Sequence, residues 1–203
     1  MFSGNKVGLT DFTGKANNCT FLDGSKLASE ACISYVLPGE EAMFLLKSQK
    51  DEYLFTDQGL IFSDGETVTS PKRTITRTNW AESNLRGVVL ITAGLMDNDI
   101  SISFHFEKDW RLEMRKEELE NGILVVKVLE SISKAQIINS RRLDLMKFAR
   151  GLTAKQDFHI NDREASGVVM AALRQDATDW VDTVMSTCMP VSFKEVMSRA
   201  LFR

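Results

Sequence analysis

Between residues 42 and 115 the sequence is a succession of short strand-like segments, and this pattern restricts the fold more than any other feature. In the clearest segment, 100–107, four apolar side chains alternate with polar ones, as in a strand with one buried face. Turn sequences such as Asp57-Gln58-Gly59 separate the segments. Short strands with hairpin-length connections predict an antiparallel barrel or sandwich. The predicted strands are 42–48, 52–56, 60–63, 68–78, 85–92, 100–107 and 110–115.

The pattern becomes helical after Arg115. Residues 116–133 place apolar side chains on one helix face, although their valine content leaves a strand open as the alternative. A second helix is predicted at 139–150, because Gly151 stands at the usual position for a helix end. The apolar face of the first helix consists of Val125, Val128, Leu129 and Ile132.

The C-terminal part predicts a longer helix and a short last one. Asn161 is suited to cap the longer helix, which ends before Pro190. Ser192 repeats the capping spacing for the last helix, and a further helix is predicted near 26–34. The apolar stripe of the longer helix predicts that Trp180 is buried. This stripe consists of Val169, Leu173, Ala177, Trp180, Val181 and Val184.

Several motifs accompany the strands: Gly39-Glu40-Glu41, Asp51-Glu52-Tyr53-Leu54-Phe55-Thr56-Asp57, Leu60-Ile61-Phe62, Ser70-Pro71-Lys72-Arg73-Thr74-Ile75-Thr76-Arg77, and Thr92-Ala93-Gly94 followed by Asp97 and Asp99. In these motifs the chain resembles the bacterial pleckstrin-homology-like domain family, in the subgroup with a YvbH-like helical C-terminal extension. The resemblance implies an α+β fold. An antiparallel seven-stranded pleckstrin-homology-like barrel with a lead-in and a capping helix would occupy 1–133, and a helical extension 134–203. It also implies self-assembly into rings and no settled ligand.

The charge balance argues against a nucleic-acid partner. The 203 residues include 25 Lys and Arg against 28 Asp and Glu, which gives a net charge of -3. No aromatic side chains are interleaved with the basic ones as in a base-stacking surface. We therefore expect no nucleic-acid binding.

The residues that carry most metal and nucleophilic chemistry are scarce. Cys19, Cys32 and Cys188 show neither CxxC spacing nor a histidine at ligand spacing, so we expect no disulfide framework, metal site or other cofactor. Only His105 and His159 are available as general bases, and the Gly-rich phosphate-binding motifs are missing from the sequence. Without a secretory-type or membrane-spanning apolar run, the protein is expected to be cytoplasmic. Because these residues assemble no activated nucleophile, metal cage or acid pair, we also expect that it is not an enzyme.

One group of basic residues lies at the first predicted hairpin and along the fourth predicted strand. In pleckstrin-homology-like barrels the open end near the first hairpin holds inositol phosphates, so the resemblance makes this group a candidate site for an anionic head group. The alternative is a solvated surface, since Asp51 and Glu52 lie beside it. The candidate binding residues are Lys47, Lys50, Lys72, Arg73 and Arg77.

A second basic concentration falls on the helical region from 134 to 155, which is also amphipathic. It suits an anionic membrane surface or an acidic partner, or else docking within the protein itself. Taken together, the sequence predicts a non-enzymatic interaction or self-assembly module, present as a homo-oligomer and open to a further protein partner. The alternative is a peripheral membrane module that binds anionic lipid head groups.

Overall fold

The computed structural model describes residues 17–65, 72–92, 94, 98–153 and 163–202. Among these, the residues up to Lys134 and from Val191 onward pack as one unit, and 135–190 form a second.

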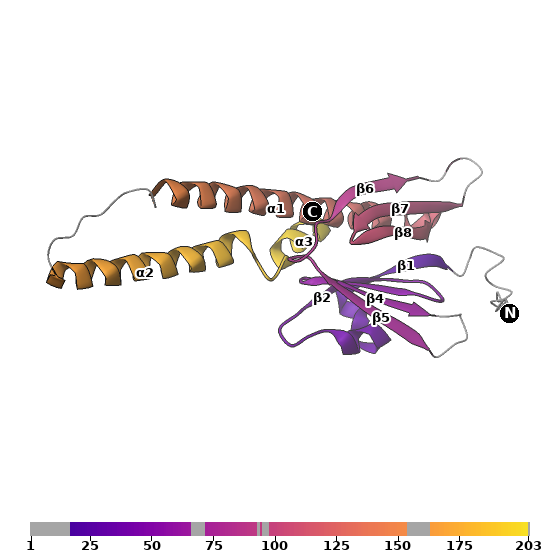
Figure 1. Ribbon diagram of the computed structural model, residues 1–203. Helices are drawn as coiled ribbons and strands as arrows, with labels where there is room; N and C mark the ends of the chain where they lie inside the picture. Colours follow the sequence, from indigo (N-terminus) through magenta and orange to yellow (C-terminus); the bar gives the residue numbers. More distant parts are fainter. Residues whose placement is uncertain (1–16, 66–71, 93, 95–97, 154–162, 203) are drawn as a thin grey trace, which may run out of the picture. The chain divides into compact units, whose positions relative to one another are not determined.

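The first unit is built on one curled sheet of eight strands, ordered β5-β4-β3-β2-β1-β8-β7-β6. Figure 1 shows β6, β7 and β8 as one layer and β2, β4 and β5 as another. The strands are β1 (Asn18–Asp23), β2 (Ala42–Lys47), β3 (Glu52–Thr56), β4 (Gly59–Gly65), β5 (Arg73–Asn79), β6 (Arg86–Ile91), β7 (Asp99–Phe106) and β8 (Lys108–Arg115).

The predicted antiparallel seven-stranded sheet is wrong in two respects, and both concern β1. This strand pairs antiparallel with β2 and parallel with β8, so the sheet is mixed and has eight strands. Its sequence, NCTFLD, lacks alternation, and only Cys19 is fully buried. A strand that is not buried on one face has no alternation of apolar and polar residues, so its sequence does not predict it.

The strands predicted from alternation are present. Ile100, Ile102, Phe104 and Phe106 on β7 are all buried, as the period of two predicted. Ser101 on the opposite face is buried as well. The predicted segment 68–78 is observed from Arg73, and its first residues lie outside the described ones.

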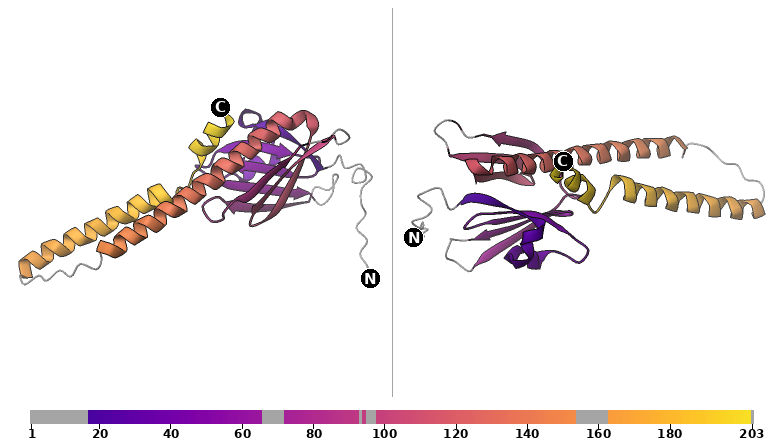
Figure 2. Two further views of the ribbon diagram at one scale, coloured as in Figure 1. Left: turned by 90° about the horizontal axis from the view of Figure 1, so that it is seen from above. Right: turned by 180° about the vertical axis from the view of Figure 1, so that it is seen from behind.

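The outer face of the β2–β5 layer is covered by two 3-10 helices, η3 (Gly24–Ser29) and η4 (Ala31–Tyr35). They stand where one helix was predicted near 26–34. Figure 2 shows this segment against the layer. Leu27 and Cys32 pack there on Leu45, Leu54 and Ile61 in one buried cluster.

After β8, a 3-10 turn, η5 (Lys116–Glu118), leads into α1 (Leu119–Thr153). The helix predicted at 116–133 and the one predicted at 139–150 are therefore a single helix, because Lys134, Ala135 and Gln136 between them all favour helix. Its predicted apolar face is buried, which removes the strand alternative. The buried residues are Val125, Val128, Leu129 and Ile132.

The second unit is a helical hairpin formed by the part of α1 from Ala135 onward and by α2 (Arg163–Cys188). The Arg150 guanidinium forms an ion pair with Asp176 at 2.5 Å and lies 5.6 Å from the ring centroid of Trp180. Trp180 is only partly buried, so the prediction that it is buried is wrong: two helices enclose too little space for a whole indole. The predicted cap Asn161 lies outside the described residues.

The last helix, α3 (Lys194–Leu201), belongs to the first unit. The Phe193 backbone N–H donates to the Asp57 carbonyl at 2.7 Å, and the Ser192 hydroxyl donates to the Asp57 carboxylate at 2.5 Å. Phe193 and Met197 are buried. The second unit is therefore an insertion in the chain, because the residues before it and the residues after it both belong to the first unit.

Met197→Ala is expected to lower the free energy of unfolding of the first unit by about 2–3 kcal/mol, because it empties a fully buried site. Met189→Ala is the matched control, since Met189 is 45% exposed. Urea unfolding measures both. Equal, small effects would contradict the packing of α3 on the sheet.

Candidate functional site

The predicted basic residues do not form one open cluster. The Lys47 ammonium at the end of β2 pairs with Glu30 and lies 3.5 Å from Glu52. Both carboxylates are largely buried, and the pKa of Lys47 is raised, first by its hydrogen bond to Glu30. Lys47 is therefore already neutralised within the protein.

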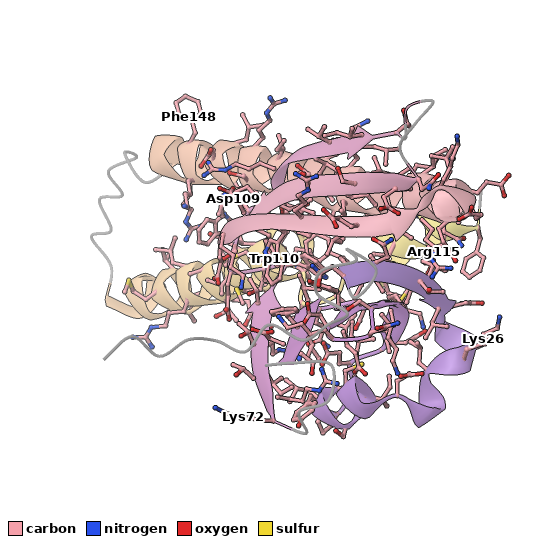
Figure 3. The ribbon with its side chains drawn as sticks, turned by 90° about the vertical axis from the view of Figure 1, so that its right-hand side faces the viewer. Lys26, Lys72, Asp109, Trp110, Arg115 and Phe148 are labelled. Atoms are coloured by element: carbon pink, nitrogen blue, oxygen red, sulfur yellow. The ribbon has the colours of Figure 1, made fainter. Side chains whose placement is uncertain are left out.

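Lys50 and Arg73 do come together, at the end of the β2–β3 hairpin. The Arg73 guanidinium donates to the Lys50 carbonyl, and the Lys50 ammonium lies 3.7 Å from Asp64. Lys72 is exposed beside them, and Figure 3 shows its side chain pointing away from the sheet.

Arg77 lies four residues along β5 from Arg73, or about 13 Å at the usual rise per residue. Its guanidinium donates two hydrogen bonds of 2.8 Å to the carboxylate of Glu40, whose side chain has no exposed surface. Burial alone would raise the pKa of Glu40, but hydrogen bonds from Arg77, Thr56 and the Leu37 backbone hold it below its ordinary value. Arg77 thus takes part in a structural ion pair.

A polar cleft of about 240 Å³ opens beside Lys50, where β1 leaves β8 to follow β2. We call it the β1–β3–β8 cleft. It contains two cations and two carboxylates, so no single charge sign dominates it. Its lining residues are Asn17, Cys19, Lys50, Asp51, Tyr53, Arg111, Leu112 and Glu113.

Burial governs the titratable groups of this cleft. It raises the pKa of the Cys19 thiol to about 12, with Asp51 and Glu113 adding to the effect by their negative charge. It also raises the pKa of the Tyr53 phenol. Burial raises the pKa of Asp51 as well, although the Gly65 backbone N–H and Lys50 oppose the rise. At neutral pH the thiol and the phenol keep their protons, so both serve the cleft as uncharged groups.

An aromatic cluster adjoins the cleft through Tyr53. Tyr53 stacks on Phe62 at 4.8 Å between centroids, and both rings meet Trp110 edge to face, at 6.0 Å and 5.1 Å. Figure 3 labels Trp110 on β8. Sequence patterns did not predict this cluster, because Tyr53 and Trp110 lie on strands that are not neighbours in the sheet, and they meet only when the sheet curls.

The remaining predicted candidates for chemistry stay apart from one another. The Nδ1 atom of His105 lies 2.8 Å from Asp109 across the β7–β8 turn, and His159 lies outside the described residues. Cys19, Cys32 and Cys188 are buried free thiols. Within the described ranges no three metal-binding side chains gather. None of the helices described there is long and apolar enough to cross a bilayer.

Comparison with known sequences gives two matches. A family model described as bacterial PH domain matches residues 12–135. The uncharacterized protein YvbH of Bacillus subtilis (strain 168) is 32% identical over 128 residues, which cover 60% of this chain and 63% of YvbH. The chain therefore spans less than two thirds of this relative.

Comparison with solved structures supports a pleckstrin-homology fold. The chain is similar to a PH-domain-containing bacterial protein from Exiguobacterium sibiricum 255-15, with a TM-score of 0.78 and 24% identity over 91% of this chain and 99% of that one. A DUF1696 family protein with a pleckstrin-homology domain from Shewanella loihica PV-4 gives a TM-score of 0.45 and 20% identity over 58% of this chain and 98% of that one. The second likeness is too loose to carry an argument.

Proposed function

Because the chain belongs to the bacterial PH domain family, as its motifs predicted, we propose that it is a non-enzymatic self-assembly module whose helical hairpin binds a second copy of the chain. The observation that carries this proposal is the apolar surface of the hairpin. Two helices bury one stripe each against the other, yet both carry further large apolar side chains that are exposed. These are Ile137, Ile138, Leu145 and Phe148 on α1, and Val168, Met170, Leu173, Val181, Met185 and Met189 on α2 and just after it.

Charge on the two helices favours a second copy as the partner. The exposed surface of α1 carries Arg141, Arg142 and Lys147 against Asp144, whereas that of α2 carries Asp176, Asp179 and Asp182 against Arg174. A second hairpin packed antiparallel would place its acidic helix beside the basic helix of the first, as in a four-helix bundle. Figure 3 shows Phe148 pointing away from α1 on the side opposite α2.

The edges of the sheet offer a second surface for self-assembly. β5 and β6 are the outermost strands, and Val89 and Ile91 on β6 are 49% and 55% exposed. Such edges pair readily with another chain. Since the two edges differ in sequence, pairing one with the other on a neighbour is head-to-tail and generates a ring or a filament.

Binding of anionic lipid receives less support from the contacts. Lys47 and Arg77 already face carboxylates, and Lys50 lies near Asp64. A patch of the remaining basic residues would contribute about 1 kcal/mol per residue at a membrane surface.

Light scattering after size-exclusion chromatography tests the proposal. The native protein is expected to run as an oligomer, and Leu145→Glu with Phe148→Glu is expected to lower the mass toward that of one chain, because two buried charges disrupt the apolar contact. Ser140→Glu, an exposed polar position on the same helix, is the matched control. A native protein that runs as a single chain and sediments with anionic liposomes would favour the lipid module instead.

A further inference from the structure

The aromatic cluster beside the β1–β3–β8 cleft already holds a cation. The Lys108 ammonium lies 4.2 Å from the ring centroid of Trp110 and 5.1 Å from that of Phe62. Tyr53 stacks on Phe62 and meets Trp110 edge to face, and Phe104 stacks on Trp110 at 6.2 Å between ring centroids. Electron-rich ring faces at this distance are the usual protein environment for an alkylated ammonium ion.

Lys108 is suited to leave this position. It is exposed at the first residue of β8, and across the described part of the chain its ammonium shows no ion pair. The preceding residue, Glu107, has a φ of 62°, the left-handed conformation that non-glycine residues rarely adopt. This turn precedes Lys108, whose ammonium lies over Phe62 and Trp110. An ammonium of this kind is strongly hydrated, so a less hydrated cation would bind the same rings more favourably.

The adjoining cleft supplies groups for both ends of a zwitterion. Tyr53 belongs to the cleft and to the cluster. Asp51 and Glu113 in the cleft attract a cation toward the rings. Burial raises the pKa of Asp51 even with Lys50 nearby, so a further cation would stabilise its charged form. Lys50 and Arg111 line the same cleft. Their nearest carboxylates are Asp64, 3.7 Å from Lys50, and Glu113, 3.4 Å from Arg111, but the Arg111 side chain is 66% exposed and can turn to a further anion. The two cations can contact an anionic group bonded a few atoms from the ammonium.

We propose that this region binds a small zwitterion with a quaternary ammonium group, which displaces Lys108 from Phe62 and Trp110 and extends its anionic group toward Lys50 and Arg111. The cleft volume of about 240 Å³ admits a ligand of this size. The chemistry is that of phosphocholine or a betaine, either as a free solute or as a lipid headgroup. The site lies within the first unit and does not depend on self-association.

Isothermal titration calorimetry of the full chain with tetramethylammonium chloride tests the site. Ammonium chloride at the same ionic strength is the matched salt, and we expect it to give no binding heat. Lys108→Ala is expected to bind tetramethylammonium about tenfold more tightly, since the resident cation no longer competes. Phe62→Leu keeps an apolar side chain but removes the ring, so affinity is expected to fall about tenfold.

Lys26→Ala is the matched control, because Lys26 is an exposed lysine on η3, far along the chain from the rings. Thermal unfolding of each variant confirms that it is folded. The proposal is overturned if Lys108→Ala binds tetramethylammonium no more tightly than Lys26→Ala does, or if ammonium binds equally well. In either case Lys108 would only cover the rings.

Two further measurements separate the possible sources of the ligand. Sedimentation with phosphatidylcholine vesicles that Phe62→Leu abolishes would identify a lipid headgroup. Calorimetric binding of phosphocholine without sedimentation would identify a free solute. Both results support the site, whereas failure of phosphocholine in a protein that binds tetramethylammonium would overturn the role of Lys50 and Arg111.

Discussion

Replacing Phe106 with alanine is expected to lower the free energy of unfolding of the first unit by about 3–5 kcal/mol. Phe106 has no exposed surface and stacks on Trp80 at 4.6 Å between ring centroids. Trp80 is itself 1% exposed, and its indole N–H donates to the Thr56 carbonyl at 2.9 Å. The cavity would therefore open beside an indole that its own hydrogen bond holds in place, which leaves little room for collapse.

The opposite face of β7 provides the control. Ser103 lies directly opposite Arg111 on β8, so Ser103→Asp adds a charge that its cross-strand partner attracts. A change within about 0.5 kcal/mol is expected for Ser103→Asp. Chemical denaturation followed by tryptophan fluorescence measures both variants. Comparable destabilisation by the two changes would show that the register of β7 is wrong.

Alternation predicted most of the sheet because burial of one face leaves a period of two in the sequence. It failed at β1, whose burial does not alternate along the strand and which pairs with strands distant in the sequence on both sides. For the same reason the sequence did not reveal that the sheet is mixed.

The helices show a related limit. The periodicity placed helical residues on both sides of 134–138, but continuity between them depended on residues of good helix propensity rather than on an apolar pattern. The apolar stripe of α2 was real, yet the sequence could not show that only one helix would cover it. Leu173 and Val181 are consequently 42% and 48% exposed.

Only part of the candidate site could be predicted from the sequence. Sequence order placed Lys50 and Arg73 near the first hairpin, where the structure also has them. It gave no indication that Arg77 would meet Glu40, because the two lie 37 residues apart and join only through the curl of the sheet. The sequence likewise did not distinguish Lys108 from the other lysines, because its position over two aromatic rings arises only in the folded chain.

Arg77→Ala is expected to lower the free energy of unfolding at neutral pH by about 3–5 kcal/mol. The change leaves the Glu40 carboxylate buried, with the Thr56 hydroxyl and the Leu37 backbone N–H as its remaining donors. Arg73→Ala is the matched control on the same strand, because Arg73 is exposed and contacts a carbonyl; about 1 kcal/mol or less is expected there. Charge reversal at Arg77 is therefore a poor probe of lipid binding, since it destabilises the sheet at the same time as it changes the charge.

The pH dependence distinguishes an ion pair from simple packing at this position. The pKa of Glu40 is lowered in the folded state, so its contribution to stability is present above the pKa of an unfolded glutamate and is lost as pH falls through the folded value. The difference in stability between wild type and Arg77→Ala should accordingly be largest at neutral pH and shrink below about pH 4. Urea unfolding at a series of pH values measures this difference, and Glu40→Gln, which cannot titrate, should flatten it. A difference that stayed constant down to acid pH would show that Arg77 stabilises the sheet by packing rather than by its charge.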